Sequence, residues 1–437
     1  MPLTESSRAG SVQGSSRVAA VVVVVQGAVL IGFIGAPIAG SEWLAWAATA
    51  CMTLAWLVQW AGWVLARRNL ALMPLFGTGE LSSESAPDSL PSAALIAPAR
   101  NEENGIESAV RSMAAIDYPK LEVIIVDDHS TDATPRILDR LARDLPNLRV
   151  THDPVPQPGW VGKLNAVRYG VQQVCPETKW LLFTDADIVF GPTVLKDAIV
   201  FVEREHIDFL TCMPYLEVDS LLEELVLLTG WLRHLDWIQY PKLNDAKSRS
   251  VGIGAFMLVR RSVYDSSGGH EAIAGEACDD AALATSLKKS GAAMGFGWAG
   301  DQLRCHQYHS YRDMMSSVVR KQRIAFKDNL WAFLCTVQYL IIRSVLPLPL
   351  AVGGVAVQLW RQDFSFAMTA FSVMAFVMYI QGVLAYAVGR RFCRIHGPAP
   401  YLHPVAGALR AWICVLGMRQ KLAGKPVDWR GRTFNTP

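Results

Sequence analysis

The stretch that decides the fold is Trp180-Leu181-Leu182-Phe183-Thr184-Asp185-Ala186-Asp187, in which two carboxylates follow a short apolar run. A run of this length suits a buried strand and is too short for a buried helix. A strand of a parallel sheet delivers the residues that follow it to the carboxyl edge, where α/β sheets bind ligands. Asp185 and Asp187 could hold one Mg²⁺ or Mn²⁺ ion there, because such ions prefer oxygen ligands. A solvated turn is the alternative, since Asp-x-Asp also occurs in ordinary loops.

Composition indicates membrane helices joined to a soluble part. Of the 437 residues, 51% are hydrophobic and only 18% are charged, a balance that is unusual for a soluble enzyme. The net charge of +2 gives no support for nucleic-acid binding. The 8 cysteines are scattered, and because they form no Cys-x-x-Cys pair we expect neither a zinc site nor a disulfide framework.

The N-terminal region predicts a membrane hairpin. Residues 1–17 are rich in Ser and Gly, and we expect them to be disordered. Two uncharged runs, 18–41 and 43–66, each reach the roughly 20 residues that cross a bilayer. A cleaved signal peptide is the alternative for the first run. Arg67-Arg68 follows the second, so the hairpin, residues 18–68, is expected to have both ends in the cytoplasm.

The C-terminal region predicts two more membrane helices within residues 331–388, one over about 331–360 and one over 364–388. Residues 389–437 are expected to form a cytoplasmic or interfacial tail. Its apolar stretch, 405–416, favours an interfacial helix because it is too short to span a bilayer. Whether it nevertheless crosses the membrane stays open.

Between these regions, residues 93–330 predict a cytoplasmic α/β domain. A polar linker over 77–92 precedes it. Short apolar runs alternate there with helical patterns, which indicates βαβ units and a parallel sheet. The expected strands are 93–97, 123–126 and 148–150 besides the one at Trp180, and the expected helices are 105–116, 133–143 and 163–174.

Polar residues follow the first two strands of this domain. Pro98 and Glu102 come after the first, where a nucleotide base or ribose would lie, although the same residues suit a helix start. Asp127 and Asp128 come after the second. A carboxylate at that place can accept hydrogen bonds from a base or a ribose, while the Ser130-Thr131-Asp132 run that follows could simply cap the next helix.

Three further groups carry charge at helix starts. Lys163 follows two glycines and could meet a phosphate there. Asp279 and Asp280 open another helix; either they only complement its dipole, or one acts as a general base toward a hydroxyl. Arg320 and Arg323 could clamp a diphosphate, or they could be the basic flank of a membrane helix.

Taken in order, these motifs make the chain resemble glycosyltransferase family 2. The resemblance covers residues 93 to about 330, and it is most similar to the membrane-bound hopene-associated and carotenoid-type lipid glycosyltransferases. The shared stretches are Pro-Gly-Trp-Val-Gly-Lys at 158–163, Asp-Asp-x-Ala-Leu at 279–283 and Val-Asp-Trp-Arg-Gly-Arg at 427–432. The resemblance implies a GT-A fold, a Rossmann-like nucleotide-diphospho-sugar transferase domain, with flanking transmembrane helices.

The resemblance also implies residue roles. Asp128, with Asp127 beside it, resembles the uracil-contacting aspartate. Asp280 aligns with the catalytic base, with Asp279 as the second choice. The remaining implied roles are nucleoside contact for Pro98 and Glu102, metal and diphosphate contact for Asp185 and Asp187, and charge stabilisation on the diphosphate for Lys163, Arg320 and Arg323. Ile324 stands where the family's Arg-x-x-Arg motif commonly continues with Trp.

The implied activity is that of an inverting hexosyltransferase that depends on Mg²⁺ or Mn²⁺. It would move one sugar from a nucleotide diphosphate, with UDP favoured, to a lipid hydroxyl at the cytoplasmic face of a bacterial cell membrane. A processive polysaccharide synthase is the first alternative, which the absent Trp disfavours. A non-catalytic scaffold that binds a nucleotide sugar is the second. Trp298 and the stretch 231–240 are candidates for an acceptor-facing wall.

Overall fold

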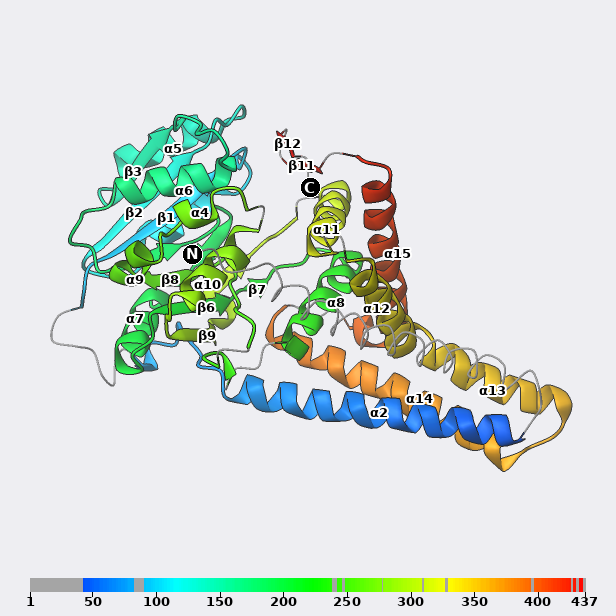
Figure 1. Cartoon of the computed structure of the whole chain (residues 1–437). Helices are drawn as coiled ribbons and strands as arrows, with labels where there is room; N and C mark the ends of the chain where they lie inside the picture. The colour runs from blue at the N-terminus through cyan, green and yellow to red at the C-terminus, as the bar shows by residue number, and fades with distance from the viewer. Residues whose placement is uncertain are drawn as a thin grey trace, which may run out of the picture.

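The structure is a computed structural model, and it describes residues 42–81, 90–237, 242–245, 248–276, 278–308, 310–326, 329–393, 397–425, 427–429 and 432–434. A sheet domain and a helical part lie side by side (Figure 1). The expected disordered segment 1–17 and the expected membrane run 18–41 lie outside the described residues.

A seven-stranded sheet forms the centre of the first part, in the order β3-β2-β1-β4-β8-β6-β9. The expected strands are all present, and the core strands β1 and β4 are buried because their apolar runs face helices on both sides. The strands are β1 Ala93–Ala99, β2 Leu121–Asp127, β3 Leu148–His152, β4 Trp180–Phe183, β6 Phe209–Met213, β8 Met257–Arg260 and β9 Met294–Trp298.

The sheet is mixed, so the expectation of a purely parallel sheet is wrong at one strand. β8 runs antiparallel to both β4 and β6. The reason is its connection: helix α8, Leu221–Trp237, leaves from the carboxyl edge of the sheet, and the chain returns to that same edge before β8 begins. A strand that enters at the carboxyl edge must run in the opposite direction.

Helices cover both faces of the sheet, and alternate residues of β1 divide between the two cores. Ala93 and Leu95 pack toward one face, whereas Ala94 and Ile96 pack toward the other, as the two-residue period of a strand requires. The first face carries α4 Ile106–Ala114, α5 Thr134–Asp144 and α7 Val194–Arg204; the second carries α6 Gly162–Gln172, α9 Arg261–Ser266, η2 Glu271–Ile273 and α10 Asp279–Lys289.

A small three-stranded sheet extends from the carboxyl edge toward the helical part. β10, Leu303–Cys305, lies between β5, Ile188–Phe190, and β7, Tyr215–Leu216. β5 begins directly after Asp187, and β7 leads into α8. The small sheet therefore connects the Asp-x-Asp segment to the helices.

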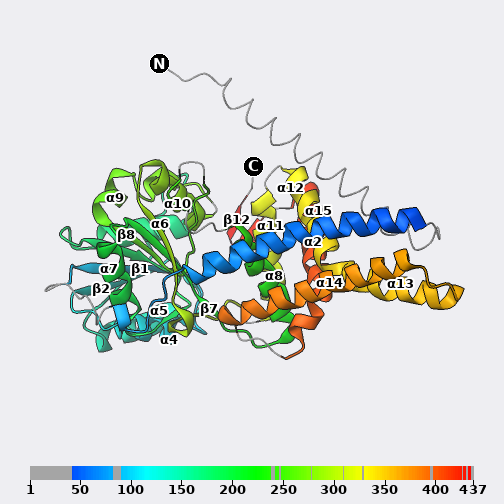
Figure 2. The ribbon, with the colours of Figure 1, turned by 90° about the horizontal axis from the view of Figure 1, so that it is seen from below.

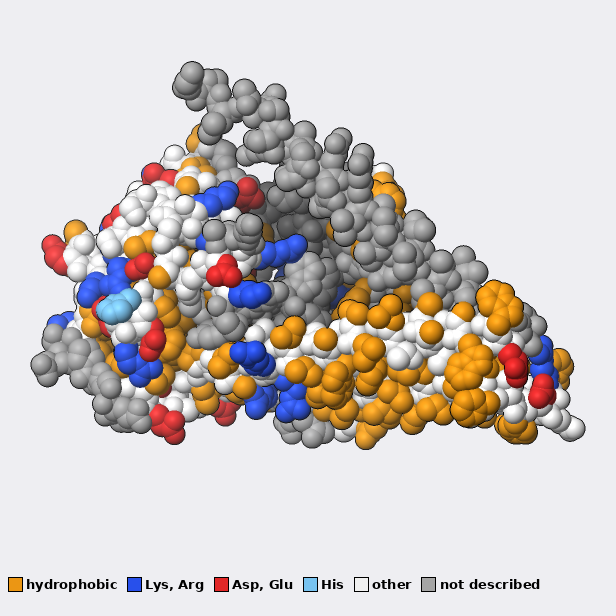
Figure 3. All heavy atoms as spheres, turned by 60° about the horizontal axis from the view of Figure 1, so that its bottom comes forward, with side chains coloured by type: hydrophobic (Ala, Val, Ile, Leu, Met, Phe, Trp, Pro, Cys, Tyr) orange, Lys and Arg blue, Asp and Glu red, His pale blue; other side chains and the backbone are white. Residues whose placement is uncertain are grey.

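In the helical part, the long helices α2, α13 and α14 extend side by side away from the sheet domain, and α15 stands across them (Figures 1 and 2). Figure 3 shows hydrophobic side chains along this surface, with basic side chains at the end nearer the sheet domain. The elements are α2 Glu42–Ala71, α11 Tyr311–Phe326, α12 Leu330–Leu340, the π-helix η4 Ile341–Val345, α13 Pro347–Arg361, α14 Phe366–Val388 and α15 His403–Leu422.

Among the described residues, three helices are long and apolar enough to cross a membrane, namely α2, α14 and the segment 399–422, and α12 to α13 would be a fourth as a bent pair. The expected helix over 331–360 is bent directly after the π-helix, and its two halves, Leu330–Val345 and Pro347–Arg361, differ in direction by 51°. The reason given for an interfacial helix over 405–416 is wrong, because α15 is 20 residues long rather than 12. These lengths are consistent with membrane association.

The start of the expected linker is part of the sheet domain. Phe76 is fully buried against Phe201, and its N–H donates to the carbonyl of Trp298 at 2.8 Å. The N–H groups of Gly77 and Gly79 both donate to one carboxylate oxygen of the buried Asp197, at 2.9 Å each. These contacts fix the end of α2 to the edge of the sheet.

The packing of Phe76 predicts that Gly297→Ala destabilises the sheet domain. A Cβ at Gly297, in β9, would lie 2.1 Å from the Phe76 ring, so the ring must move at a cost of about 1–3 kcal/mol. Gly62→Ala is the matched control, because a Cβ there meets nothing within 4 Å and the helix favours Ala. Thermal unfolding of both variants in detergent would check this; equal midpoints would contradict the packing role.

Candidate active site

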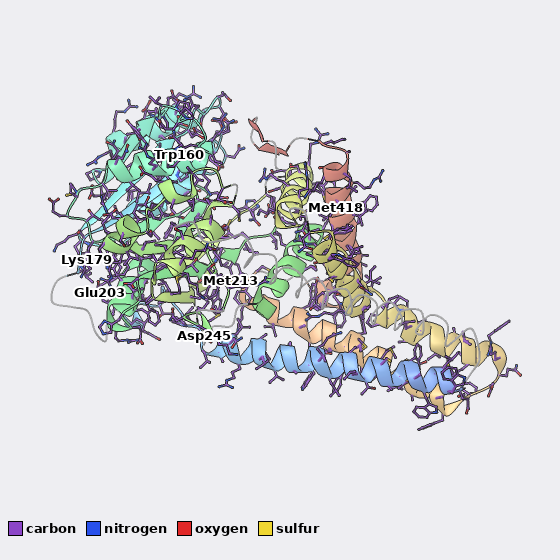
Figure 4. The ribbon with its side chains drawn as sticks, viewed as in Figure 1. Trp160, Lys179, Glu203, Met213, Asp245 and Met418 are labelled. Carbon is purple, nitrogen blue, oxygen red and sulfur yellow. The ribbon has the colours of Figure 1, made fainter. Side chains whose placement is uncertain are left out.

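The carboxyl ends of the central strands face the helical part. In Figure 4, Lys179 and Glu203 mark the outer edge of the sheet, whereas Met213, at the end of β6, lies toward the helices. Because β4 begins at Trp180, its last residue and the Asp-x-Asp segment lie on the helical side. This is the edge at which α/β sheets bind ligands.

Lys163 joins two of the predicted motifs at this edge. Its ammonium lies 2.6 Å from Asp185 Oδ1 and 2.8 Å from Asp279 Oδ2. Burial would lower the pKa of Lys163, but the two carboxylates outweigh it and hold that pKa well above its ordinary value. The loop after β4 and the start of α10 are thus held together by one cation from the start of α6.

The neighbouring acids Asp279 and Asp280 lie in different environments. Burial would raise the pKa of Asp279, but the Lys163 ammonium outweighs it and holds the pKa below the ordinary value. Burial, and next the charge of Asp279, raise the pKa of Asp280. Asp280 Oδ1 accepts from the N–H of Ala281 at 2.7 Å and from the Cys278 thiol at 3.1 Å. A raised pKa beside a lowered one is the arrangement that separates a proton acceptor from a permanently charged partner.

A buried histidine behind this cluster was missed by sequence reasoning. The Tyr264 hydroxyl accepts from the backbone N–H of His270 at 3.2 Å and lies 2.8 Å from His270 Nδ1. Burial lowers the pKa of His270 to about 4, so the ring is neutral at pH 7. Gly269 has a φ of 49° and leaves no room for a side chain beside the Tyr264 ring. The signal available in the sequence was Gly-Gly-His ahead of the acid pair.

The loops after β1 and β2 are bonded to each other. The N–H of Asn101 donates to Ser130 Oγ at 2.9 Å, and that of Glu102 donates to Thr134 Oγ1 at 2.8 Å. Asn101 has a positive φ of 52°, and its side-chain oxygen accepts from the N–H of Thr131 at 2.8 Å. The predicted nucleoside loops therefore form one wall, with Pro98 half-buried at its base.

Asp127 and Asp128 are both buried but have different partners. Asp127 Oδ2 lies 3.0 Å from His152 Nδ1, and His152 Nε2 lies 3.0 Å from Asp139. Burial would lower the pKa of His152, but these two carboxylates raise it. Asp128 lies 3.1 Å from His129, which has a positive φ of 59°. Asp127 is thus directed toward β3, and Asp128 toward the loop after β2.

Asp185 and Asp187 supply the oxygen ligands that a hard cation prefers. Burial raises the pKa of the Cys305 thiol, and the charges of Asp187 and Asp185 add to that rise. In the described part of the chain no group of three His, Cys, Asp or Glu side chains is arranged to hold a metal. Two carboxylates that leave the other positions to phosphate and water are a common Mg²⁺ arrangement.

The basic motif lies on α11, in the helical part (Figure 1). Arg320 donates to Ser317 Oγ of its own helix at 3.1 Å, and the buried Arg323 donates to the carbonyl of Lys425. The charge of the intervening Lys321 lowers the pKa of the Cys305 thiol, whereas the charges of Asp185 and Asp187 raise it. Lys321 was given no role of its own in the sequence analysis, but its charge reaches the Cys305 thiol at this edge.

Trp298 is packed rather than presented to a ligand. It is half-buried in the second core, and its ring lies 5.6 Å from that of Phe392. The side chains of the other proposed wall, residues 231–240, lie outside the described part. Trp160 of the Pro-Gly-Trp segment instead lies at the start of α6 (Figure 4), with the Arg168 guanidinium 5.3 Å from its ring centre.

Comparison with known proteins identifies the family of the chain. The sequence model of a family described as glycosyltransferase like family 2 matches residues 91–321, more than half of the chain. The chain belongs to this family. Its mixed α/β domain has the GT-A fold, and the protein is a glycosyltransferase. The matched range includes Arg320 and ends before Arg323.

Curated relatives of this family 2 glycosyltransferase match over shorter segments. The beta-monoglucosyldiacylglycerol synthase of Synechocystis sp. is 35% identical over 25% of the chain and 21% of its own length. The 4,4'-diaponeurosporenoate glycosyltransferase of Staphylococcus haemolyticus is 25% identical over 41% of the chain and 47% of its own length. The matches therefore span between a fifth and a half of these relatives. A solved mannosyltransferase from Pyrobaculum calidifontis, in complex with GDP-Man and Mn²⁺, shares 17% identity at a TM-score of 0.48, over 92% of the chain and 99% of its own.

Proposed function

We propose that this glycosyltransferase moves a single sugar, with inversion at the anomeric carbon, from a nucleotide-diphosphate sugar to the hydroxyl of a membrane lipid. The observation that carries the proposal is the contact of Lys163 with both Asp185 and Asp279. It brings a cation, a strand-end carboxylate and a helix-start carboxylate to one point at the ligand-binding edge. Asp280, with its raised pKa, lies next to that point.

The donor's nucleoside would lie on the wall formed by the loops after β1 and β2. Asp128 and Glu102 would accept hydrogen bonds from the base and ribose, with Pro98 beneath them and Asp127 holding the wall to His152. The diphosphate would then reach Lys163, with Arg320, Lys321 and Arg323 contributing positive charge from α11. UDP is the favoured carrier, because Asp128 resembles a uracil-contacting residue.

Asp280 would act as the general base. Its carboxylate would take the proton of the acceptor hydroxyl as the hydroxyl oxygen attacks the anomeric carbon and the bond to the diphosphate breaks. Lys163 would stabilise the negative charge that develops on the departing diphosphate. Asp279 would keep Lys163 in place and, through its own charge, keep the pKa of Asp280 high.

Asp185 and Asp187 would hold a divalent cation, Mg²⁺ or Mn²⁺. When bound, such an ion neutralises charge on the donor's phosphates. Asp187→Asn is expected to weaken Mn²⁺ binding by at least roughly tenfold, the loss seen even for outer-shell changes. Titration of Mn²⁺ against the purified protein, by paramagnetic resonance and without donor, measures this directly. An unchanged affinity would contradict the assignment, and Asp197→Asn, which changes a buried carboxylate bonded to Gly77 and Gly79, is the matched control.

The lipid acceptor is supported by the helical part and by what the relatives' names describe. The helices that are long enough to cross a membrane adjoin the carboxyl edge of the sheet, so a membrane lipid could reach the site from that side. The two curated relatives are named for a glucosyldiacylglycerol and a carotenoid acid. A hopanoid, a carotenoid or a glycerolipid would each present a nucleophile there, and the catalytic domain would face the cytoplasm.

The experiment is product formation by the full chain in nanodiscs, with a panel of UDP- and GDP-sugars, Mg²⁺ or Mn²⁺, and a total lipid extract. We expect one donor to yield a glycolipid whose new anomeric centre, read by proton resonance, is inverted relative to the donor. A polymer instead of a single-sugar product would establish the processive synthase. Donor binding without turnover in any condition would establish the scaffold.

A further inference from the structure

The carboxylate of Asp127 is enclosed by the protein and bonded on both of its oxygens. Its side chain is 1% exposed. Oδ1 accepts from the N–H of Ser130 at 3.3 Å, and Oδ2 lies 3.0 Å from His152 Nδ1. Because both oxygens are used in this way, we expect Asp127 to act on the wall formed by the loops after β1 and β2 from behind, rather than to contact a nucleotide itself.

His152 connects Asp127 to the surface of the domain. It is the last residue of β3, where it pairs in register with Asp127 of β2, and α5 packs against the same strand. Its Nε2 lies 3.0 Å from Oδ1 of Asp139 in α5, a side chain that is 59% exposed. A neutral imidazole has only one N–H, so only the protonated ring can donate to both carboxylates at once.

The cationic side chains of β3 and α5 are directed elsewhere. Arg149 of β3 donates to the carbonyl of Gln173, and Arg140 of α5 pairs with Glu107. The other cations of α5 are exposed to water: Arg136 and Arg143. The charged groups that β2 and α5 present to His152 are therefore the two carboxylates of Asp127 and Asp139.

Three neighbouring strands are each followed by a residue with a left-handed backbone. β3, β2 and β1 are adjacent in the sheet, and Asp153, His129 and Asn101, which follow them, have φ values of 48°, 59° and 52°. Residues other than glycine keep such a conformation where surrounding contacts hold them, often beside ligand sites. The N–H of Asp153 donates to the carbonyl of Asp127 at 2.9 Å, so this turn and the contact between His152 and Asp127 support each other.

Ser130 extends these contacts to the loop after β1. Its N–H is bonded to Asp127, and its Oγ accepts from the N–H of Asn101 at 2.9 Å. Hydrogen bonds therefore run without a break from the surface of α5 to that loop, through Asp139, His152, Asp127, Ser130 and Asn101. Asp128 lies between Asp127 and Ser130 in the chain, so the bond that joins these two residues fixes both ends of the turn that carries it.

We propose that His152 and Asp139 are positioning residues for the donor: they hold the buried Asp127, and through it the turn over 127–130 that presents Asp128 to the nucleoside. This inference rests on the proposed function, because it takes the loops after β1 and β2 as the nucleoside wall. A charged donor bonds a carboxylate more strongly than a neutral donor does. The turn is therefore held best while His152 is protonated, and nucleotide affinity follows the charge of a side chain that does not touch the nucleotide.

The test is calorimetric titration of the full chain in nanodiscs with UDP and Mg²⁺, or with GDP where GDP binds more tightly, at a series of pH values. Burial would lower the pKa of His152, but the hydrogen bonds to Asp127 and Asp139 raise it above 6.5, so the wild-type affinity should fall as the pH rises through that raised pKa. H152L removes the donor to Asp127 and should bind the nucleotide about tenfold more weakly, the contribution of one charged hydrogen bond. H152Q keeps an N–H donor but does not titrate, so its affinity should lie between the two.

The pH dependence separates a positioning role from a merely structural one. Titration of the nucleotide itself, and of His129 beside Asp128, is present in every variant and cancels in the ratio of wild type to H152Q. D139N removes one of the charges that raise the pKa of His152, so the fall in affinity should move to lower pH. D144N is the matched control, because Asp144 is also an exposed aspartate of α5 but pairs with Arg111 instead; it should keep the wild-type profile.

Two results would overturn the proposal: an H152Q variant with the same pH dependence as the wild type, or D139N and D144N variants with the same profile. If H152L does not fold, H152Q and D139N, which keep a polar side chain at each position, decide the question by their profiles alone. In sugar transfer, H152Q should raise the KM for the donor and leave kcat unchanged. A protein that binds the nucleotide with the expected pH dependence but transfers no sugar would refute the proposed function and support this inference; a protein that binds neither nucleotide would refute both.

Discussion

Asp280→Asn is expected to lower the rate of sugar transfer by roughly 10²–10⁴-fold, the usual contribution of a general base, while donor affinity stays near the wild-type value. The variant should also stay folded. Burial raises the pKa of Asp280, so its ionised form lowers stability at pH values above the ordinary 3.8, and a neutral amide removes that cost. Single-turnover transfer and donor titration, made on the same preparation, separate the two effects.

Asp279→Asn also tests the assignment of Asp280 as the general base. The wild-type rate should fall as the pH drops through the raised pKa of Asp280, because the base must be ionised. Burial is the first cause of that raised pKa and the charge of Asp279 is the second. Removing the Asp279 charge should therefore shift the acid limb of the rate profile to lower pH, with transfer still well above that of Asp280→Asn. The reverse ranking of the two variants would make Asp279 the base.

The strands of this domain could be predicted from the sequence because each is a short apolar run that ends in polar residues. The direction of β8 could not be predicted, because it depends on the edge of the sheet to which the chain returns after α8. The bend directly after η4 was also not predicted, because a π-turn has no hydrophobic period of its own. The length of α15 was underestimated because Arg410 and the polar residues near its end interrupt the apolar run without ending the helix.

The motifs of the site could likewise be found as local patterns, but not their contacts. Lys163 was expected to contact a phosphate. In the structure it forms ion pairs with Asp185 and Asp279, which come from distant parts of the chain. Only the sheet topology places the start of α6 beside the start of α10. His270 was missed because its burial and its contact with Tyr264 depend on the folded Gly-Gly turn. Contacts of this kind depend on tertiary structure and leave no periodic signal.

Lys163→Met is expected to have the largest effect on stability among the site variants. It would leave Asp185 and Asp279 close together without their shared cation, and an uncompensated buried charge is costly. We expect a loss of about 3 kcal/mol in the free energy of unfolding at pH 7, the low end for buried pairs, because the Asp185 side chain remains 39% exposed. Donor affinity should fall as well, since a diphosphate would then meet two carboxylates.

The pH dependence of this loss gives the assignment a second test. In the wild type the pKa of Asp279 is lowered, so its pairing with Lys163 stabilises the fold above the ordinary pKa of 3.8 and ceases to do so as the pH falls below it. The raised pKa of Lys163 preserves the pair up to pH values above 10.5. The difference in unfolding free energy between wild type and Lys163→Met should therefore be full at pH 7 and shrink as the pH falls below 3.8. Lys179→Met is the control, because it removes an exposed partner of Glu203 at the opposite edge of the sheet (Figure 4). It should change stability by less than about 1 kcal/mol at either pH. Equal losses in the two variants would mean that the Lys163 contacts are no stronger than a surface ion pair.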